Sequence, residues 1–527
     1  MLNVMKKIVL IFLFGCYITY SQNVVIDNSF GTNGSVLTEN TTGMSKTIII
    51  EDDKFISVGS KTITTTPYVH TAVLAKYNSD GSLDSAFGSN GIVNTIIEYR
   101  NGCGGILLQS DNKILVAGEY YATTPDGPGG RYGYLARYES NGDLDVSFGD
   151  NGIKKINFLN NGASCSLSAI AILPNNQILA SIGVGSGYPY RGLAVKFNAD
   201  GSLDTTYGTN GLVPIYNTPT FRFTIFQLIL TSDSKILLCG NDTSIYNNPK
   251  FTVVRLNLDG TFDTTFGDNG KVILDLDPTL LDGTVITSEY ASKMIELTDS
   301  KILIKGGVPN GDHVLIELNT DGSLVSTFGT NGILIDNYVF YDYLSRNDLA
   351  VQNNGKILLC GTNTSSTNPI LNVVRLNQDG SLDTTFNSTG FFDLAVTNSI
   401  ENNLSNINFQ SDGNLIVSGS SLLNNNYVSS HTRLLIDDTL GVIGNNQDND
   451  NFKVYPNPFT NNINITSNSV NVISRIKICD TTGRLVKEIA NINTNTVSTE
   501  LNLASGIYYC TIIYENGNQF IQKIVRE

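Results

Sequence analysis

Short hydrophobic runs, separated by turn-forming residues, fill most of the chain. In one representative stretch, residues 91–99, 104–110, 113–120 and 132–140 are rich in Ile, Val, Leu and Tyr, and Gly, Asn and Asp lie between them. β-Branched and aromatic residues favour strands, whereas Gly, Asn and Asp favour turns. No convincing helical periodicity is present. The stretch therefore predicts four short strands and no helix.

This four-strand pattern recurs about every sixty residues along the chain. An aromatic-Gly-x-x-Gly element begins at Phe30, Phe87, Phe148, Tyr207, Phe266 and Phe328, and again at Phe386, where Asn387 replaces the first Gly. Two further elements, of the types KILVAG and LARYN, also recur once per unit. Seven units of four strands predict an all-β fold, a seven-bladed β-propeller over residues 23–443. A solenoid is the alternative, but its repeats are normally shorter.

The two ends of the repeat region complement each other. The last unit ends at residues 433–441 without the Phe-Gly phrase, and residues 24–34 carry this phrase with no unit before it. We therefore expect the start of the chain to complete the last blade, which would leave no open strand edge.

The phrase DGSLDSAFGSNG, at residues 80–91, has a structural interpretation. Leu83 and Phe87 are apolar anchors that can pack between neighbouring blades, and Asp84 can accept hydrogen bonds from nearby backbone N–H groups. Calcium binding by these aspartates is the alternative. Against it, Val325 replaces the aspartate in one copy while the surrounding phrase survives. We therefore expect the phrase to hold blades together.

The repeat resembles the delta-sixty repeat family. The matching segments are LDSAFGSNG, KILVAG and LARYN with their equivalents, and they cover residues 24–441. The resemblance implies a large secreted or surface bacterial protein of repeat architecture. It implies no particular activity.

The first residues have the pattern of a secretory signal peptide, assigned to residues 1–22. Lys6 and Lys7 precede an apolar run that is too short to span a membrane, and small and polar residues follow. A lipoprotein signal ending at Cys16 is the alternative, although Phe14 is bulky where such signals have a small residue. No later segment reaches membrane-spanning length, so we expect no transmembrane segment in the mature protein.

A polar linker at residues 444–452 precedes a different C-terminal pattern. Alternating strands and turns over residues 453–527 predict a small Ig-like β-sandwich. The region resembles the type A C-terminal sorting domain of the type IX secretion system. The residues that carry this resemblance are Tyr455, Pro456, Asn457 and Pro458, then Gly483 and Arg484, then Gly506 and Tyr508, and finally Lys523. A generic sandwich is the alternative.

The sorting resemblance implies partners and a location. It implies handling by the type IX secretion machinery and passage to the outside of a Gram-negative bacterium. There the protein would be released or attached to surface lipopolysaccharide, and the sequence does not distinguish the two. The net charge of −15 repels phosphate backbones and anionic lipid, which argues against nucleic-acid binding.

No catalytic or metal-binding motif stands out in the sequence. The three histidines, His70, His313 and His431, have no metal-ligand spacing, and we expect them to be exposed loop or strand-edge residues. No nucleophile motif or phosphate-binding loop is present. We therefore expect no cofactor, no metal and no enzyme activity. Whether Cys103 pairs with Cys165, or Cys479 with Cys510, remains open.

One face of the expected propeller varies between units, and aromatic residues gather in its loops. These residues are Tyr121, Tyr132, Tyr188, Tyr190, Phe340, Tyr341 and Tyr343. Variable loops on a rigid scaffold often bind ligands, and Tyr offers contact area at low entropic cost. The leading hypothesis is a non-catalytic binding or adhesion protein with a glycan as candidate ligand. Solvated loops on a structural surface protein, or a polysaccharide-degrading propeller, are the alternatives.

Overall fold

The computed structural model describes most of the chain outside the N-terminal segment. The described residues are 24–39, 44–65, 68–98, 100–121, 130–158, 164–185, 191–215, 223–244, 249–276, 289–308, 313–336, 348–363, 370–394, 402–423, 426–436, 452–467, 472–480, 485–515 and 519–527. The expected signal peptide and residues 444–451 of the expected linker lie outside them. The chain divides into two compact units, Val24–Ile436 and a second that includes Asp437–Glu527.

Four sheets of Val24–Ile436 each contain four consecutive strands. The first contains β3 (Met44–Ile49), β4 (Phe55–Thr65), β5 (Tyr68–Tyr77) and β6 (Ile92–Thr95). The next contains β15 (Phe223–Leu230), β16 (Ile236–Asp242), β17 (Lys250–Leu256) and β18 (Lys271–Leu274). The third contains β19 (Tyr290–Glu296), β20 (Ile302–Gly307), β21 (His313–Leu318) and β22 (Ile333–Asp336). The fourth contains β23 (Leu349–Val351), β24 (Ile357–Asn363), β25 (Ile370–Leu376) and β26 (Phe391–Leu394).

A larger sheet contains eight strands in two consecutive groups of four. The first group is β7 (Arg100–Leu108), β8 (Ile114–Tyr121), β9 (Arg131–Tyr138) and β10 (Ile153–Ile156). The second is β11 (Ser164–Ile172), β12 (Ile178–Gly185), β13 (Arg191–Phe197) and β14 (Leu212–Pro214). A single parallel pair, Cys165 with Tyr132, joins the two groups.

The remaining sheet joins the start of the chain to the end of the repeat region. It contains β27 (Asn402–Phe409), β28 (Leu415–Leu423), β29 (Asn426–Ile436), β1 (Val24–Ile26) and β2 (Ser35–Thr38). Val24 lies opposite Ile436, and Ser35 lies opposite Thr432, in antiparallel pairing. The expected pairing of chain start with the last unit is therefore present.

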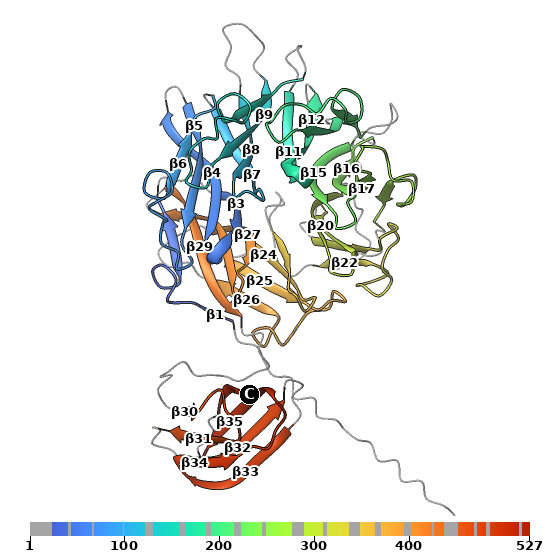
Figure 1. Cartoon of the computed structure of the whole chain (residues 1–527). Helices are drawn as coiled ribbons and strands as arrows, with labels where there is room; N and C mark the ends of the chain where they lie inside the picture. Colours follow the sequence, from blue (N-terminus) through green and yellow to red (C-terminus); the bar gives the residue numbers. More distant parts are fainter. Residues whose placement is uncertain are drawn as a thin grey trace, which may run out of the picture. The chain divides into compact units, whose positions relative to one another are not determined.

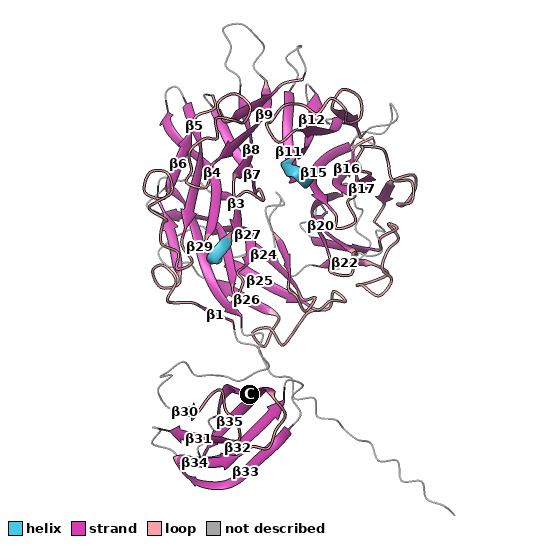
Figure 2. Ribbon diagram, in the orientation of Figure 1, coloured by secondary structure: helices cyan, strands magenta, loops and turns pink. Residues whose placement is uncertain are grey.

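The sheets are arranged in a ring, and the first strand of a sheet, such as β7, β11 or β15, faces its centre (Figure 1). Among the described residues, helical structure is limited to two short 3₁₀ segments, η1 (Glu51–Asp53) and η2 (Pro174–Asn176) (Figure 2). The unit is thus all-β and propeller-like. Apolar residues of neighbouring sheets share one buried cluster, which includes Leu74 of β5, Leu115 of β8 and Ile182 of β12.

The repeated phrase connects each copy to the next around the ring. Gly88 N donates a hydrogen bond to Asn141 O at 2.8 Å, and the same link joins Gly149 N to Asp200 O at 2.8 Å. Gly142 has a φ of +93°, and a Cβ there would lie 3.0 Å from the Phe87 ring. Gly therefore suits this turn for both its conformation and its small size.

An ion pair within the phrase recurs in most copies. Asp145 Oδ2 lies 2.6 Å from Arg137 Nε and 2.7 Å from Lys113 Nζ, while Oδ1 accepts from Ser147 Oγ at 2.6 Å. Burial alone would raise the pKa of Asp145, but the hydrogen bonds from Lys113 and Ser147 hold it below its usual range. The corresponding pairs are Lys76–Asp84, Lys196–Asp204, Arg255–Asp263 and Arg375–Asp383. These carboxylates bind residues of their own fold, as the structural interpretation predicts.

The C-terminal unit contains two sheets around one core. One contains β30 (Phe452–Tyr455), β31 (Asn462–Ser467) and β34 (Thr496–Glu500). The other contains β32 (Ile473–Asp480), β33 (Leu485–Thr494), β35 (Gly506–Tyr514) and β36 (Gln519–Arg526). Ile463 and Ile465 of the first sheet share a buried cluster with Ile476 and Ile512 of the second. Apolar side chains from both sheets therefore stabilise this unit.

Candidate ligand-binding site

The structure describes two of the seven predicted binding aromatics. Tyr121 ends β8 and is 46% exposed. Tyr132 lies on β9 and is buried, with its ring centroid 5.6 Å from that of Tyr120. The other five, Tyr188, Tyr190, Phe340, Tyr341 and Tyr343, lie outside the described residues. The role of all seven in binding remains a prediction.

Tyr121 lines a cavity of about 470 Å³ near the ring centre. Strand β7 contributes residues 101–105, β8 contributes residues 117–119 and β11 contributes residues 167–170, and single residues of β5 and β9 complete the lining. Tyr121 and Arg131 flank the connection between β8 and β9, so the cavity opens beside a connection that the sequence assigned to the variable face.

Glycine keeps one wall of this cavity open. A Cβ added at Gly102 or Gly104 would meet no heavy atom within 4 Å. The β7–β8 register shifts between Cys103 and Gly105, so Gly104 occupies a β-bulge. On the adjacent strand, a Cβ at Gly118 would come within 2.1 Å of Gly102 O. Gly118 therefore permits close strand packing, while Gly102 and Gly104 leave free volume.

Polar groups converge on the same volume. The Glu119 carboxylate forms an ion pair with the Arg131 guanidinium, and burial raises the pKa of Glu119. Asn101 donates from Nδ2 to Glu98 O at 3.2 Å, and no described residue hydrogen-bonds to its buried Oδ1. The cavity is thus lined by the Tyr121 side chain, the Glu119–Arg131 pair and Asn101, whose buried amide oxygen has no partner among the described residues. These groups can stack on an apolar face and hydrogen-bond to hydroxyl groups.

Sequence reasoning identified Tyr121 but missed Asn101, Glu119 and Arg131. A signal was present, because residues 101–105 read NGCGG while the corresponding inner strands of other units hold larger side chains. Glycines in a strand interior mark a bulge or a close approach of another group.

The histidine expectation was wrong for two of the three residues. His313 and His431 are buried, at 8% and 0% exposure. His431 lies 2.9 Å from Ser418 Oγ through Nδ1, and burial lowers its pKa to about 3. Each of the two lies on a strand that is paired on both sides, β21 with β20 and β22, and β29 with β28 and β2, so that its side chain is shielded from solvent. His70 lines the Tyr121 cavity.

Among the described residues, no disulfide joins Cys103 to Cys165 or Cys479 to Cys510. Cys103 and Cys165 are buried, as is Cys510, and Cys479 is half-buried. Burial raises the pKa of the Cys103 thiol to about 11, which opposes reactivity.

The predicted sorting residues form a connected structure in the C-terminal unit. Asn457 Nδ2 donates to Lys523 O at 2.8 Å, and Asn457 Oδ1 accepts from Val525 N at 2.8 Å. Tyr508 is buried and donates to Ala504 O at 2.8 Å, whereas Tyr455 is 48% exposed. Pro456 and Pro458 flank Asn457, and Gly506 begins β35. Gly483 and Arg484 lie outside the described residues.

Two family models match the chain. Residues 453–527 match the secretion system C-terminal sorting domain. The C-terminal unit is a type IX secretion sorting domain. Residues 109–148, 231–266 and 352–386 match a β-propeller family described as a domain of unknown function, which is close to the delta-sixty repeat resemblance. The sorting domain implies export by the type IX secretion system and cell-surface attachment.

Solved structures offer distant likenesses to this exported protein. A protein of unknown function from Dyadobacter fermentans is 11% identical, with a TM-score of 0.41 over 78% of this chain and 99% of its own. Saccharomyces cerevisiae Sqt1 is 9% identical, with a TM-score of 0.36 over 96% and 99% of the two chains. Trypanosoma rangeli sialidase is 8% identical, with a TM-score of 0.36 over 83% and 87%. At such scores none bears on activity.

A search of curated proteins gives no match. Within the described part of the chain, no helix has the length and apolar character needed to cross a membrane.

Proposed function

We propose that this exported protein is a non-catalytic binding protein whose propeller holds a carbohydrate in the Tyr121 cavity. The observation that carries the proposal is the combination of an exposed Tyr ring, a glycine-lined wall and the unsatisfied Oδ1 of Asn101 in one volume. A cavity of about 470 Å³ has the size typical of small-ligand sites.

A sugar matches the cavity in both shape and polarity. One face of a pyranose ring carries C–H groups that can stack on Tyr121, and its hydroxyls can donate to Asn101 Oδ1 and to Glu119. Arg131 can donate to ring or hydroxyl oxygens of the same sugar. Asn101 Oδ1 is buried without a partner among the described residues, so a ligand hydroxyl that donates to it would favour binding.

Binding fits the cavity better than glycoside hydrolysis does. Hydrolysis normally needs two carboxyl groups that flank the scissile bond. Among the described lining residues, Glu119 is the single carboxylate, and Arg131 neutralises it. A purely structural surface protein is the other alternative, and it offers no account of the Asn101 oxygen or of the open glycine wall.

We infer a seven-bladed ring for the scaffold of this site. The eight-stranded sheet counts as two blades, because one residue pair alone joins its halves. The sheet that combines β27–β29 with β1 and β2 counts as the closing blade. We also assign the sorting domain to the Ig-like sandwiches and the mature protein to the outer surface of a Gram-negative bacterium. Lipopolysaccharide or another surface glycan is then a candidate partner.

A glycan panel tests the proposal on the full chain. We expect at least one glycan to bind, and Tyr121→Ala to weaken that binding about tenfold or more, since loss of a stacked ring costs on the order of 1–2 kcal/mol. Gly104→Leu should block binding without unfolding, because its side chain would extend into free volume. Tyr427→Ala is the matched control, since Tyr427 is 50% exposed and does not line the cavity. Equal binding by all four proteins would refute this site.

A further inference from the structure

The innermost strands place one residue each at an equivalent position around the ring. These residues are Lys46, Gly105, Ala169, Gln227, Lys293, Asp348 and Asn406, and they are called the axial ring below. For six of these residues the strand pairing shows the equivalence, because each lies opposite the same position of the second strand in its sheet. Lys46, for example, lies opposite Val58, and Lys293 lies opposite Lys305. The backbone O of Asp348 accepts a hydrogen bond from Cys360 N at 3.2 Å, so Asp348 occupies the equivalent position in its own sheet.

Three axial-ring side chains link neighbouring sheets. Asn406 Oδ1 accepts from Thr47 N at 2.6 Å, and Asp348 Oδ2 accepts from Ile407 N at 3.4 Å. Gln227 Oε1 accepts from Met294 N in the same way. Each acceptor thus binds the residue that follows the axial-ring position of the next sheet. A lysine has no acceptor atom, so neither Lys46 nor Lys293 can accept the equivalent backbone hydrogen bond.

The charges in this cluster are unbalanced. The Lys293 ammonium forms an ion pair with Asp348 Oδ1, while Asp348 Oδ2 is occupied by Asn406 Nδ2 at 3.1 Å. Among the described residues, no ion pair joins Lys46 to a carboxylate. Lys305, which is 2% exposed, lies opposite Lys293 on the neighbouring strand. Lys46 and Lys293 together thus carry two positive charges beside the single negative charge of Asp348.

The surroundings of Lys46 reflect this imbalance. Asp348 raises the pKa of Lys46, but burial and the nearby charge of Lys293 outweigh it and lower this pKa to about 8. The other carboxylate of the lining, Glu296, is already bound by Ser232, whose N and Oγ lie 2.7 Å from its two oxygens. An additional negative group would therefore be stabilised here.

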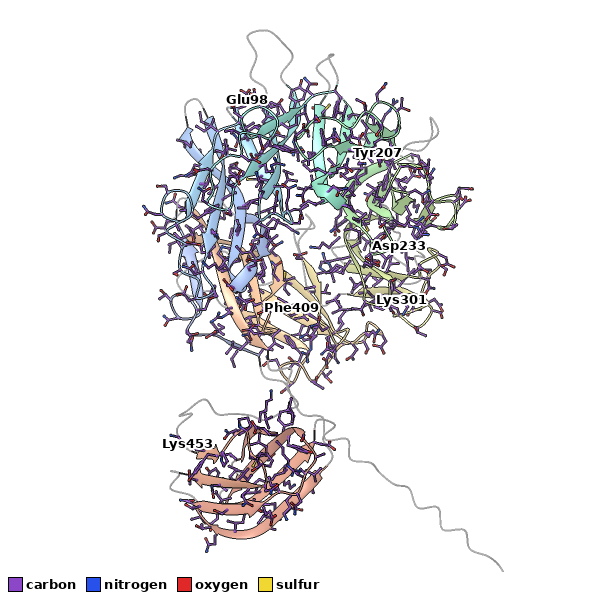
Figure 3. The ribbon with its side chains drawn as sticks, in the orientation of Figure 1. Glu98, Tyr207, Asp233, Lys301, Phe409 and Lys453 are labelled. Atoms are coloured by element: carbon purple, nitrogen blue, oxygen red, sulfur yellow. The ribbon has the colours of Figure 1, made fainter. Side chains whose placement is uncertain are left out.

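Space for such a group exists beside the lysines. A cavity of about 480 Å³ is lined by Lys46, Lys293 and Asp348, together with Gln227 and residues of β27 that include Phe409. Figure 3 labels Phe409 on this inner strand. The lining residues differ from those of the Tyr121 cavity, so the two sites are separate.

We propose that this axial cavity is an anion-binding site, in which the ammonium groups of Lys46 and Lys293 hold a carboxylate, sulfate or phosphate group. The anion supplies a negative charge next to Lys46, which forms no ion pair with a described carboxylate. Because the site lies inside the ring of an exported protein, the anionic group can belong to a free ion or to an acidic substituent of a larger ligand.

Inorganic phosphate and sulfate are the probes, applied to the full chain in calorimetry and thermal melts. We expect both to bind and to raise the melting temperature above that in sodium chloride of equal ionic strength. Lys46→Gln should weaken binding at least tenfold while the protein stays folded, because Gln already occupies the equivalent position 227. Lys61→Met, on β4, is the control for loss of a lysine elsewhere and should bind normally.

The pH dependence gives a second readout. Binding should weaken as the pH rises above about 8, where Lys46 loses its proton, and Lys293, Lys305, Asp348, Glu296 and Cys360 are the other ionisable groups near the cavity. A Lys293→Gln variant serves if Lys46→Gln does not fold. No effect of phosphate beyond that of sodium chloride, or equal binding by wild type and both lysine variants, would overturn the proposal. Acetate and a uronic acid, tested next, separate a free inorganic ion from a carboxylate-bearing ligand.

Discussion

Arg433 Nε donates to Asp27 Oδ2 across 2.7 Å, although 406 positions separate the two residues in the chain. Arg433 also donates through Nη1 to Ser79 O at 2.8 Å, and its guanidinium lies 5.1 Å from the centre of the Phe30 ring. One side chain near the end of the repeat region thus contacts the chain start and the next sheet. Arg137 and Arg255 make the equivalent contacts, each with an aspartate of its phrase and with a backbone O of the next copy.

We expect removal of this junction to open the ring. A protein that begins at residue 40 lacks β1 and β2, so β29 would expose an unpaired edge and aggregate. A protein that begins at residue 24 should remain soluble and unfold in one cooperative transition. Size-exclusion chromatography and thermal melts compare the two. Similar solubility and cooperativity would show that the chain start is dispensable.

A point mutation tests the same junction without removing β1 and β2. Arg433→Ala removes the Asp27 and Ser79 contacts together and should lower the free energy of unfolding by about 2–4 kcal/mol, as expected when a partly buried charge loses its partner. Lys61→Ala should change stability by less than about 1 kcal/mol, because no ion pair joins Lys61 to a carboxylate in the described part of the chain. Urea unfolding measures both values.

Sequence periodicity was enough to predict the repeated four-strand sheets, because every copy must satisfy the same packing. In six copies of the described chain, the aromatic residue of the phrase lies close to the turn glycine of the next copy, as Phe87 does to Gly142, so the chain repeats both. The sorting motif was equally visible, since Asn457 binds Lys523 and Val525 directly.

The candidate sites were less predictable, because they depend on where copies differ and on contacts between sheets. Asn101 and Glu119 line the Tyr121 cavity together with residues of β11, a contact between two sheets that no local sequence pattern specifies. The axial ring joins strands that are distant in sequence, and its lysines resemble ordinary surface lysines on inspection. The burial of His431 likewise depends on the Phe55 and Tyr77 rings that pack around it.

The phrase aspartates should matter for stability and little for ligand binding. Asp145→Ala removes the partner of Arg137 and Lys113, and we expect a loss of about 2–4 kcal/mol in the free energy of unfolding. Asp143→Ala is the control, since Asp143 is exposed in the same phrase. If Asp145→Ala abolished glycan binding while stability held, the phrase would be a binding site after all.

The sixth copy of the phrase, which contains Phe328, offers the reverse experiment. Glu317 replaces the basic residue there and Val325 replaces the aspartate, so both partners of the ion pair are absent from this copy. Glu317→Arg with Val325→Asp should restore it beside Lys301 and stabilise the protein by up to about 1 kcal/mol, while each single change should destabilise it. A double-mutant cycle with no positive coupling would contradict this account of the pair.

Acid should destabilise the propeller through the same carboxylates. Burial raises the pKa of Asp84 and of Asp383, but their hydrogen bonds and the nearby lysines lower both pKa values overall. A carboxyl group with a lowered pKa in the folded state stabilises it above the unfolded pKa of about 3.9, and this contribution is lost as the pH falls through the folded value. We therefore expect the unfolding free energy to decrease below about pH 4. The decrease should be smaller in Asp383→Asn, which has already lost one such group.

The last prediction concerns export. Deletion of residues 453–527 should leave the protein in the periplasm, because the sorting domain is removed. Asn457→Ala should have a milder effect, since it removes two hydrogen bonds of 2.8 Å that join the segment after β30 to β36. We expect it to lower the stability of the C-terminal unit by about 1–2 kcal/mol and to reduce export in proportion. Asn462→Ala, at an exposed position of β31, is the matched control and should be exported normally. Fractionation of cells into periplasm, surface and medium measures each variant. Normal export of the deletion variant would refute the sorting role, whereas normal export of Asn457→Ala alone would mean that export does not depend on the link between Asn457 and the last strand.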